Sequence, residues 1–331
     1  MLKKILIILC VLSGSFQSRA REASLNLDDI LWECEVKDFC EEEYERAVEL
    51  LVAAYEKESG KALVPGRKKK VGLKVYTHSG LGLSTPKNLV NAVLKMLSRR
   101  GFRPEDVFLI DLNDWYLRKA RYLPALSKRS LLYKETYSVY SQEGGAYGNL
   151  NWHYSSNLPP LYGQLGDAQA DERLSYLPYP LLWEVDFWIN LPMVVNHDAL
   201  GVSGALANAS VWNMTNSRRF LRSPRHVAEA VAEVAAIPEL KRTWVFTIMT
   251  LERYQYIGGI KFNSLYTVSE NKIWLSSNPV VMDYKMYEKI NRKRKAGNFP
   301  MIQPIPLSFE YSKQLGLGNY VSKALMIKKL K

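Results

Sequence analysis

The chain is poor in the residues that build metal clusters and disulfide scaffolds. Its 331 residues include 3 cysteines and 4 histidines. Three cysteines are too few for a four-cysteine zinc or iron–sulfur site, so no iron–sulfur cluster is expected. No segment repeats with a period of roughly 20–50 residues, which argues against solenoids and propellers. Hydrophobic residues make up 47% of the chain and charged residues 24%, as is typical of a folded globular protein.

Long hydrophobic runs are also absent, and crossing a bilayer takes about 20 apolar residues in a row. The apolar run at residues 5–12 is much shorter. It follows Lys3 and Lys4 and precedes small and polar residues that end at Ala20. This order is typical of a secretory signal peptide. We therefore expect residues 1–20 to be removed near Ala20, leaving a secreted or periplasmic chain with no membrane span.

Positive charge exceeds negative charge, with 45 Lys and Arg against 33 Asp and Glu. Basic clusters at residues 67–70 and 292–295 have the composition of nucleic-acid patches. No nucleic-acid-binding motif accompanies them, and export argues against that partner. We interpret both clusters as solvated segments and expect no nucleic acid to bind.

Two cysteines, Cys34 and Cys40, remain in the chain after the expected cleavage. In an oxidising compartment they can form a disulfide. Six residues apart on one continuous helix they would lie too far apart to bond. A bridge therefore requires a turn between them, near Asp38 and Phe39, and the sequence leaves its presence open.

Periodicity along the chain predicts alternating strands and helices, and hence an α/β fold with a mostly parallel sheet flanked by helices. Three helices begin at a polar residue followed by proline, which suits the cap and the first helical position. Helices are expected at residues 41–59, 85–100, 223–236, 278–295 and 309–315. Strands are expected at residues 71–76, 107–112, 185–190, 243–251, 256–262, 273–276 and 321–327.

This pattern divides the chain into three parts: a signal peptide at 1–20, a helical segment with a linker at 21–66, and an α/β domain at 67–331. Residues 113–183 interrupt the domain as an aromatic-rich loop insertion, with 13 Trp and Tyr among 71 residues. Such side chains stabilise a loop-rich subdomain by their large buried area. They also stack on flat ligands such as sugars.

Ligands of open α/β sheets bind beyond the carboxyl ends of the strands, and three loops leave such ends here. The first follows the strand at 71–76 and contains His78, Ser79, Gly80 and Gly82. A glycine-containing turn before a helix exposes backbone N–H groups that suit an anion. A plain tight turn explains the same residues equally well.

The second loop, at residues 192–208, is polar and rich in small residues, which makes it the strongest candidate for a site. His197 suits acid–base chemistry or metal binding. The other candidate residues of this loop are Asn196, Gly201, Ser203, Gly204 and Asn208.

The third candidate is Asp111, at the end of the strand at 107–112. A carboxylate there can hold a metal ion or a sugar hydroxyl, or it can cap the following turn. The sequence thus predicts a pocket in which His78, His197 and Asn208 act on the ligand, with Asp111 and His197 as candidate metal ligands.

The second loop also resembles a known family. Asp186-Phe-Trp-Ile-Asn-Leu-Pro192, followed by His197-x-x-Leu-Gly-Val-x-Gly-Ala-Leu-x-Asn208, is similar to the signature of the domain of unknown function 362 (DUF362) family. The segments at 71–76, 85–101 and 278–283 resemble other parts of that family. The resemblance implies an α/β domain whose activity is not settled.

The chain departs from the DUF362 pattern in two ways. Many members carry a ferredoxin-like cluster segment, for which this chain lacks the cysteines. Where the family loop usually has three lysines, this sequence has Met193, Val195 and Ala207, while His197 and Asn208 remain. These replacements weaken the case for any anion binding or lysine chemistry that the family shares.

Two functions follow from these observations. The first is an exported DUF362-like protein with a pocket for a small molecule, an anion or a metal ion at the carboxyl ends of its strands. The second is a non-catalytic periplasmic binding protein that holds a sugar or peptide on the aromatic insertion. An enzyme needs titratable groups in mutual reach, whereas a binding protein needs only a concave surface with a few polar groups.

Overall fold

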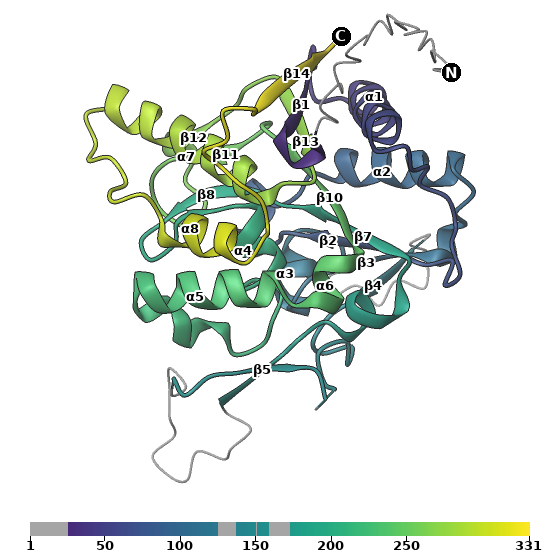
Figure 1. The fold of residues 1–331 in the computed structure, drawn as a ribbon, viewed down its shortest axis with the longest axis horizontal. Coiled ribbons are helices and arrows are strands. Elements are labelled where there is room, and N and C mark those ends of the chain that lie inside the picture. Colours follow the sequence, from purple (N-terminus) through teal and green to yellow (C-terminus); the bar gives the residue numbers. More distant parts are fainter. Residues whose placement is uncertain (1–25, 125–136, 150, 159–172) are drawn as a thin grey trace, which may run out of the picture.

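A computed structural model describes residues 26–124, 137–149, 151–158 and 173–331. The predicted signal peptide lies outside the described residues, as do parts of the predicted insertion. The described chain is mixed α/β, with one large sheet flanked by helices (Figure 1). The predicted fold class is confirmed.

The large sheet has eight strands in the order β14-β1-β13-β10-β7-β2-β3-β4. Each strand pairs in parallel with its neighbours except β13, which runs antiparallel to both β1 and β10. The strands are β1 (Ile30–Glu35), β2 (Val71–Val75), β3 (Val107–Ile110), β4 (Ser138–Tyr140), β7 (Phe187–Leu191), β10 (Trp244–Thr250), β13 (Lys272–Ser276) and β14 (Met326–Leu330).

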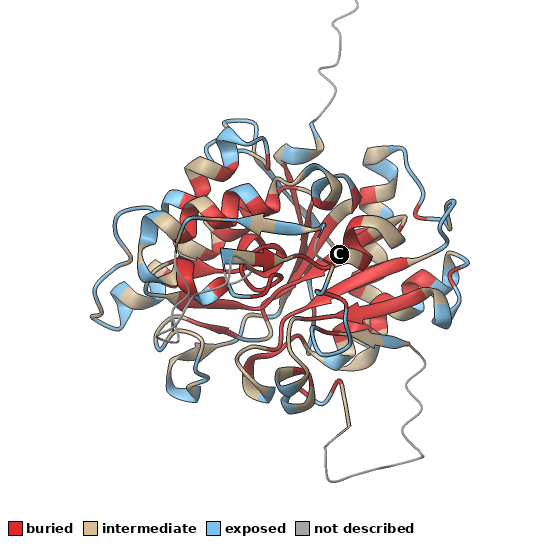
Figure 2. Cartoon of the chain, turned by 90° about the horizontal axis from the view of Figure 1, so that it is seen from below, coloured by how far each residue is buried: buried red, intermediate tan, exposed pale blue. Residues whose placement is uncertain are grey.

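Helices cover both faces of this sheet and so bury its central strands. All five residues of β2 are buried, and Figure 2 shows the sheet as the buried centre of the molecule. Apolar side chains of α1 and α2 pack with Leu73 on one face, and those of α4 and α5 pack with Trp188 on the other. The helices are α1 (Glu41–Ser59), α2 (Lys87–Arg99), α3 (Asp114–Lys119), α4 (Ala205–Ala209), α5 (Pro224–Ala235), α6 (Pro238–Thr243), α7 (Pro279–Ala296) and α8 (Leu307–Gln314).

Two of the three predicted cap-plus-proline helix starts are confirmed. The Ser223 side chain accepts from the N–H of Arg225 at the start of α5, and the Asn278 side chain accepts from the N–H of Val281 at the start of α7. The third prediction is wrong. Helix α2 begins at Lys87, and the Thr85 hydroxyl donates to the Leu191 carbonyl (2.6 Å) instead of capping the helix.

The segment at 21–66 contains a strand that its pattern does not predict. Strand β1 lies inside the large sheet, between β13 and β14, and α1 packs into the same core as β2. The described part of this segment therefore belongs to the α/β body. The strand expected at 256–262 is wrong, because β11 (Tyr254–Gln255) ends before it. The last strand lies later than expected, at β14.

A second sheet replaces the loop that was expected at 192–208. Strands β8 (Val194–His197) and β9 (Gly201–Ser203) form a hairpin, and β11 pairs with β8 and with β12 (Thr267–Val268). Helix α4 follows directly and is buried along its length. The polar residues of this segment are therefore held in regular structure rather than in an open loop.

The predicted insertion is only partly a loop. Strand β4 joins the large sheet beside β3, and β5 (His153–Ser155) pairs with β6 (Leu174–Tyr176). Several described aromatic rings pack on one another or on the core. Ring centroids lie 4.8 Å apart for Trp152 and Trp183 and 4.6 Å apart for Tyr140 and Phe108. These rings have the stabilising role that was one of the two expectations.

Two further expectations concern the cysteines and the membrane. Cys34 lies in β1 and Cys40 at the start of α1, and both are free thiols. Among the described residues, no helix is long and apolar enough to cross a bilayer.

Candidate functional site

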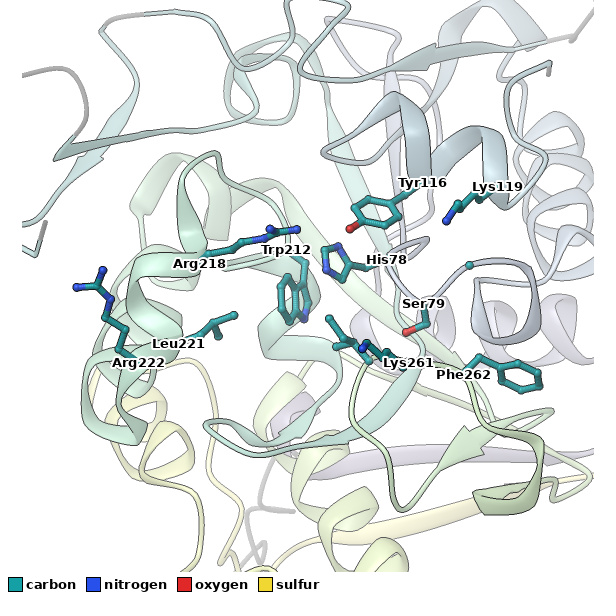
Figure 3. Close-up of a pocket in the computed structure, with 12 residues that line it drawn as sticks. His78, Ser79, Tyr116, Lys119, Trp212, Arg218, Leu221, Arg222, Lys261 and Phe262 are labelled. Carbon is teal, nitrogen blue, oxygen red and sulfur yellow. The ribbon is translucent and has the colours of Figure 1, made fainter. Parts of the chain in front are cut away.

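A cavity of about 720 Å³ lies beyond the carboxyl end of β2. The turn that follows β2 contributes His78, Ser79 and Gly80, three of the residues predicted from sequence. The remaining lining residues come from α3, the segment after α4 and the loop after β11 (Figure 3); they are Tyr116, Lys119, Trp212, Arg218, Leu221, Arg222, Ile260, Lys261 and Phe262.

The His78 imidazole lies between two aromatic rings (Figure 3). Its centroid is 4.3 Å from that of Tyr116 and 4.7 Å from that of Trp212, on which it stacks. Burial lowers the pKa of His78 to about 4, Asp111 opposes this shift, and the nearby cations Arg218 and Lys74 reinforce it. His78 is therefore neutral at pH 7. Its nitrogens make no hydrogen bond to any described residue, so they are available to a ligand.

The cavity is lined by cations and by no carboxylate from the described residues. Lys119 and Lys261 lie on one side of His78, and the Arg218 guanidinium lies on the other (Figure 3). Arg222 also lines the cavity, although its side chain points away from the other residues in this view. An excess of positive charge in a concave site raises the local concentration of anions.

Asp111 does not line the cavity and belongs to a buried polar network below it. Its carboxylate accepts from the Lys74 ammonium (2.7 Å) and from the Thr77 hydroxyl (2.5 Å) and N–H (2.8 Å). Lys74 also donates to the Val75 carbonyl and to Asn208 Oδ1, so all three ammonium protons have partners. Burial lowers the pKa of Lys74, and the Asp111 charge opposes the shift. The pair ties β2 to β3.

Asn208, predicted to act on the ligand, is fully buried in the same network. Its Oδ1 accepts from Lys74, and its Nδ2 donates to Asn190 Oδ1 (2.7 Å) and to the Lys74 carbonyl. These bonds attach α4 to β2 and β7. Asn208 thus holds the sheet beneath the cavity and does not reach the cavity itself.

His197 lies behind the cavity wall. Its Nδ1 accepts from the N–H groups of Ala199 and Leu200, which stabilises the β8–β9 turn. Its ring centroid is 6.0 Å from that of Trp212. Because both predicted histidines contact Trp212, their separation cannot exceed the sum of the two distances to that ring. Both histidines therefore lie near Trp212, but only His78 lines the cavity.

The remaining predicted residues support the walls. The Ser203 hydroxyl accepts from Trp212 Nε1 (2.7 Å), and Asn196 Oδ1 accepts from the N–H of Gly259 (3.1 Å), in the loop that carries Lys261. Gly201 has a φ of +68° in the β8–β9 turn. Gly204 leaves room for the Asp283 carboxylate, which a Cβ there would overlap.

Gly82 does not line the cavity, and its carbonyl accepts from Arg253 Nη1 (3.1 Å). The expected helix N-terminus is not at this cavity either. Helix α2 begins at Lys87, beside a separate concavity of about 400 Å³ that is lined by Pro86 and Lys87. Positive charge in the main cavity therefore comes from side chains.

The geometry limits the chemistry available. The described residues contain no group of three or more His, Cys, Asp or Glu that could hold a metal ion. Asp111 and His197 lie in separate environments, and the metal site predicted from them stays a prediction without support from their contacts. The Ser79 hydroxyl bonds to the Tyr76 hydroxyl (2.7 Å) and not to His78, so these two do not form a nucleophile–base pair.

Sequence reasoning missed most of the cavity wall. Trp212, Arg218 and Arg222 follow α4 in the chain, and the four arginines between residues 217 and 225 were the available signal. Lys261 and Phe262 were hidden because their segment was expected to be a strand. Tyr116 lies within the aromatic-rich stretch, where nothing in the sequence distinguishes it from the other tyrosines.

Comparisons with known proteins add little to this description. No family model matches the sequence, and no curated protein matches it. A crystal structure of a Thermotoga maritima protein, a structural genomics target, is similar over 67% of this chain, with 13% identity and a TM-score of 0.32. The chain spans about half of that protein, 52% of its length. A likeness at this level says nothing about function.

Proposed function

We propose that this protein binds a small anionic ligand in the cavity beyond β2. The observation that carries the proposal is the lining itself, which places Lys119, Arg218 and Lys261 around one imidazole without a carboxylate among the described residues. Arg218 and Lys261 form no hydrogen bond or ion pair with other described side chains, so a ligand would supply the missing negative charge.

The cavity also favours a ligand that is not purely ionic. Leu221, Ile260 and Phe262 give it an apolar wall, and sites of this size for small molecules are usually apolar with a few convergent polar groups. The neutral His78 ring can accept or donate one hydrogen bond, which would orient the ligand. A carboxylate or phosphate on a small organic body fits this description.

The test is a calorimetric titration with inorganic pyrophosphate and with citrate. We expect binding by the wild-type protein and roughly a tenfold or greater loss of affinity in Arg218→Gln, since a charged hydrogen bond contributes about 1.5–3 kcal/mol. Arg103→Gln is the matched control. Arg103 is exposed and pairs with Asp106 before β3, at the amino ends of the strands and so away from the cavity. Equal binding by both variants, or no binding by the wild type, would contradict the proposal.

We also propose that the chain is an exported member of the DUF362 family. The support is the sequence signature at 186–208 and the leader-like order of residues 1–20. The alternative, a sugar or peptide held on the insertion, finds little support in the described rings, because Trp152, Trp183 and Tyr140 pack on other rings.

A further inference from the structure

Large apolar side chains lie exposed on the segments that supply the cavity lining. Leu265 is 80% exposed, Trp115 55%, Leu81 51% and Phe262 43%. We call these four residues the apolar tips. They come from the turn after β2, from α3 after β3 and from the loop after β11. Exposed apolar groups gathered at one place on a protein surface mark a contact site.

Contacts bring the tips from separate segments together. The Phe262 ring lies so close to Gly82, the neighbour of Leu81, that a Cβ at Gly82 would overlap it. Arg253 Nη1 donates to the Gly82 carbonyl (3.1 Å) and so fixes the turn next to the loop. Leu265 follows three residues after Phe262, in the short helical turn Ser264–Tyr266.

Trp115 joins the same rim through Lys119. The Lys119 ammonium lies 4.8 Å from the centroid of the Trp115 ring, and Lys119 lines the cavity together with Phe262. Figure 3 shows Lys119, Ser79 and Phe262 on one side of the cavity. The four tips therefore lie on the segments that form this side of the cavity, and Phe262 lines it.

Cations alternate with the tips on this rim. Lys119, Lys261 and Arg253 are exposed, while the carboxylates that lie near them in the chain are already engaged. Asp114 pairs with Arg118 (3.1 Å). Glu252 accepts from the Tyr44 hydroxyl (2.6 Å) and also pairs with Arg253 (3.6 Å), so the unbalanced positive charge among the described residues of this rim comes from Lys119 and Lys261. The rim is therefore apolar and positively charged at once.

We propose that this rim rests on an anionic lipid surface, with the apolar tips inserted among the headgroups. An interfacial surface combines apolar side chains, often Trp and Phe, with Lys and Arg. Basic side chains gain energy beside anionic headgroups. The tips lie on separate turns and a short helix, with charges between them, which suits a fluid surface better than the continuous apolar centre of a protein interface. The inference goes beyond the proposed function and does not depend on it.

The test is co-sedimentation of the full chain with vesicles of phosphatidylcholine alone and of phosphatidylcholine mixed with phosphatidylglycerol. We expect binding to the mixed vesicles that weakens as salt is added, and little binding to the neutral ones. The double variant F262S/L265S should bind the mixed vesicles at least about tenfold more weakly, because both side chains lose their burial in lipid. Both positions are exposed, so the fold should tolerate the change.

Two controls separate this rim from other surfaces. Val64→Ser changes a side chain that is 56% exposed and precedes β2, on the side of the amino ends of the strands. This variant should leave vesicle binding unchanged. K68Q/K69Q removes two positive charges just before β2, on the same side as Val64, and should also retain vesicle binding. Wild-type binding by F262S/L265S, loss of binding in K68Q/K69Q, or no preference for phosphatidylglycerol would overturn the proposal. Pyrophosphate binding is measured without vesicles, so either inference can fail alone.

Discussion

Asp283 is a carboxylate that forms no ion pair with a cation among the described residues. It lies on α7, 1% exposed, and accepts from the N–H groups of Ala205 (2.6 Å) and Leu206 (2.9 Å) at the start of α4. Burial raises its pKa to about 7, and the two backbone N–H groups oppose the shift. In the unfolded chain the pKa of an aspartate is about 3.9.

This shift predicts a pH-dependent stability. Between about pH 4 and pH 7 the folded protein retains a proton that the unfolded chain has released, so stability falls as pH rises through this window, by up to about 4 kcal/mol. Asp283→Asn does not titrate and should remove this part of the slope. Urea unfolding of both proteins between about pH 4 and pH 7 measures how the free energy of unfolding changes with pH. Identical slopes for the two proteins would show that Asp283 stays ionised in the folded state.

The candidate site was predictable at the residues next to strand ends and unpredictable elsewhere. His78, Ser79 and Gly80 follow β2 directly, and the rule that ligands bind at carboxyl ends identifies them. Asp111 obeys the same rule, yet Lys74 occupies its carboxylate. A sequence does not show that a strand-interior lysine will turn toward a neighbouring strand, so the network under the cavity could not be anticipated.

At the scale of elements, the helices were predicted better than the strands because their ends carry chemical signals. Helix α1 has the expected bounds, with Gly60 after it in the left-handed conformation, and α5 and α7 begin at their predicted caps. Strand β1 was missed because it carries two charged residues, Glu33 and Glu35. Glu33 is tolerated because it pairs with Lys272 and accepts from Trp274, neither of which is near in sequence.

The cap of α7 gives a test at this scale. Asn278 is fully buried, and its side chain also donates to the Asp28 and Asn319 carbonyls. Asn278→Ala should therefore destabilise the protein by about 2–3 kcal/mol, more than the roughly 1 kcal/mol of an ordinary cap. Asn26→Ala, which removes the exposed cap of the short helix Leu27–Asp29, is the control and should cost less than about 1 kcal/mol. Thermal unfolding compares the two, and equal losses would refute the argument.

For the whole molecule, the first question is where the mature chain begins. If residues 1–20 are a signal peptide, the N-terminal sequence of the protein recovered from the cells that make it begins at Arg21, or at Ser24 if cleavage follows Ala23 instead. Protein retained in the cytoplasm with residues 1–20 intact would refute the proposed export. Arg19→Ala is a useful comparison, because it alters the predicted cleavage region without changing the apolar run.

The position of β1 has a consequence for how the chain folds. Trp32 pairs with Leu275 on one side and with Lys328 on the other. Strand β1 is therefore synthesised long before its partners β13 and β14. Contacts this distant in sequence slow folding, because a long loop must close before they form. During synthesis the parallel unit of β2, β3 and β7 can assemble first. The part of the sheet around β1 can close only after β13 and then β14 have been synthesised, so β1 has no sheet partners until then.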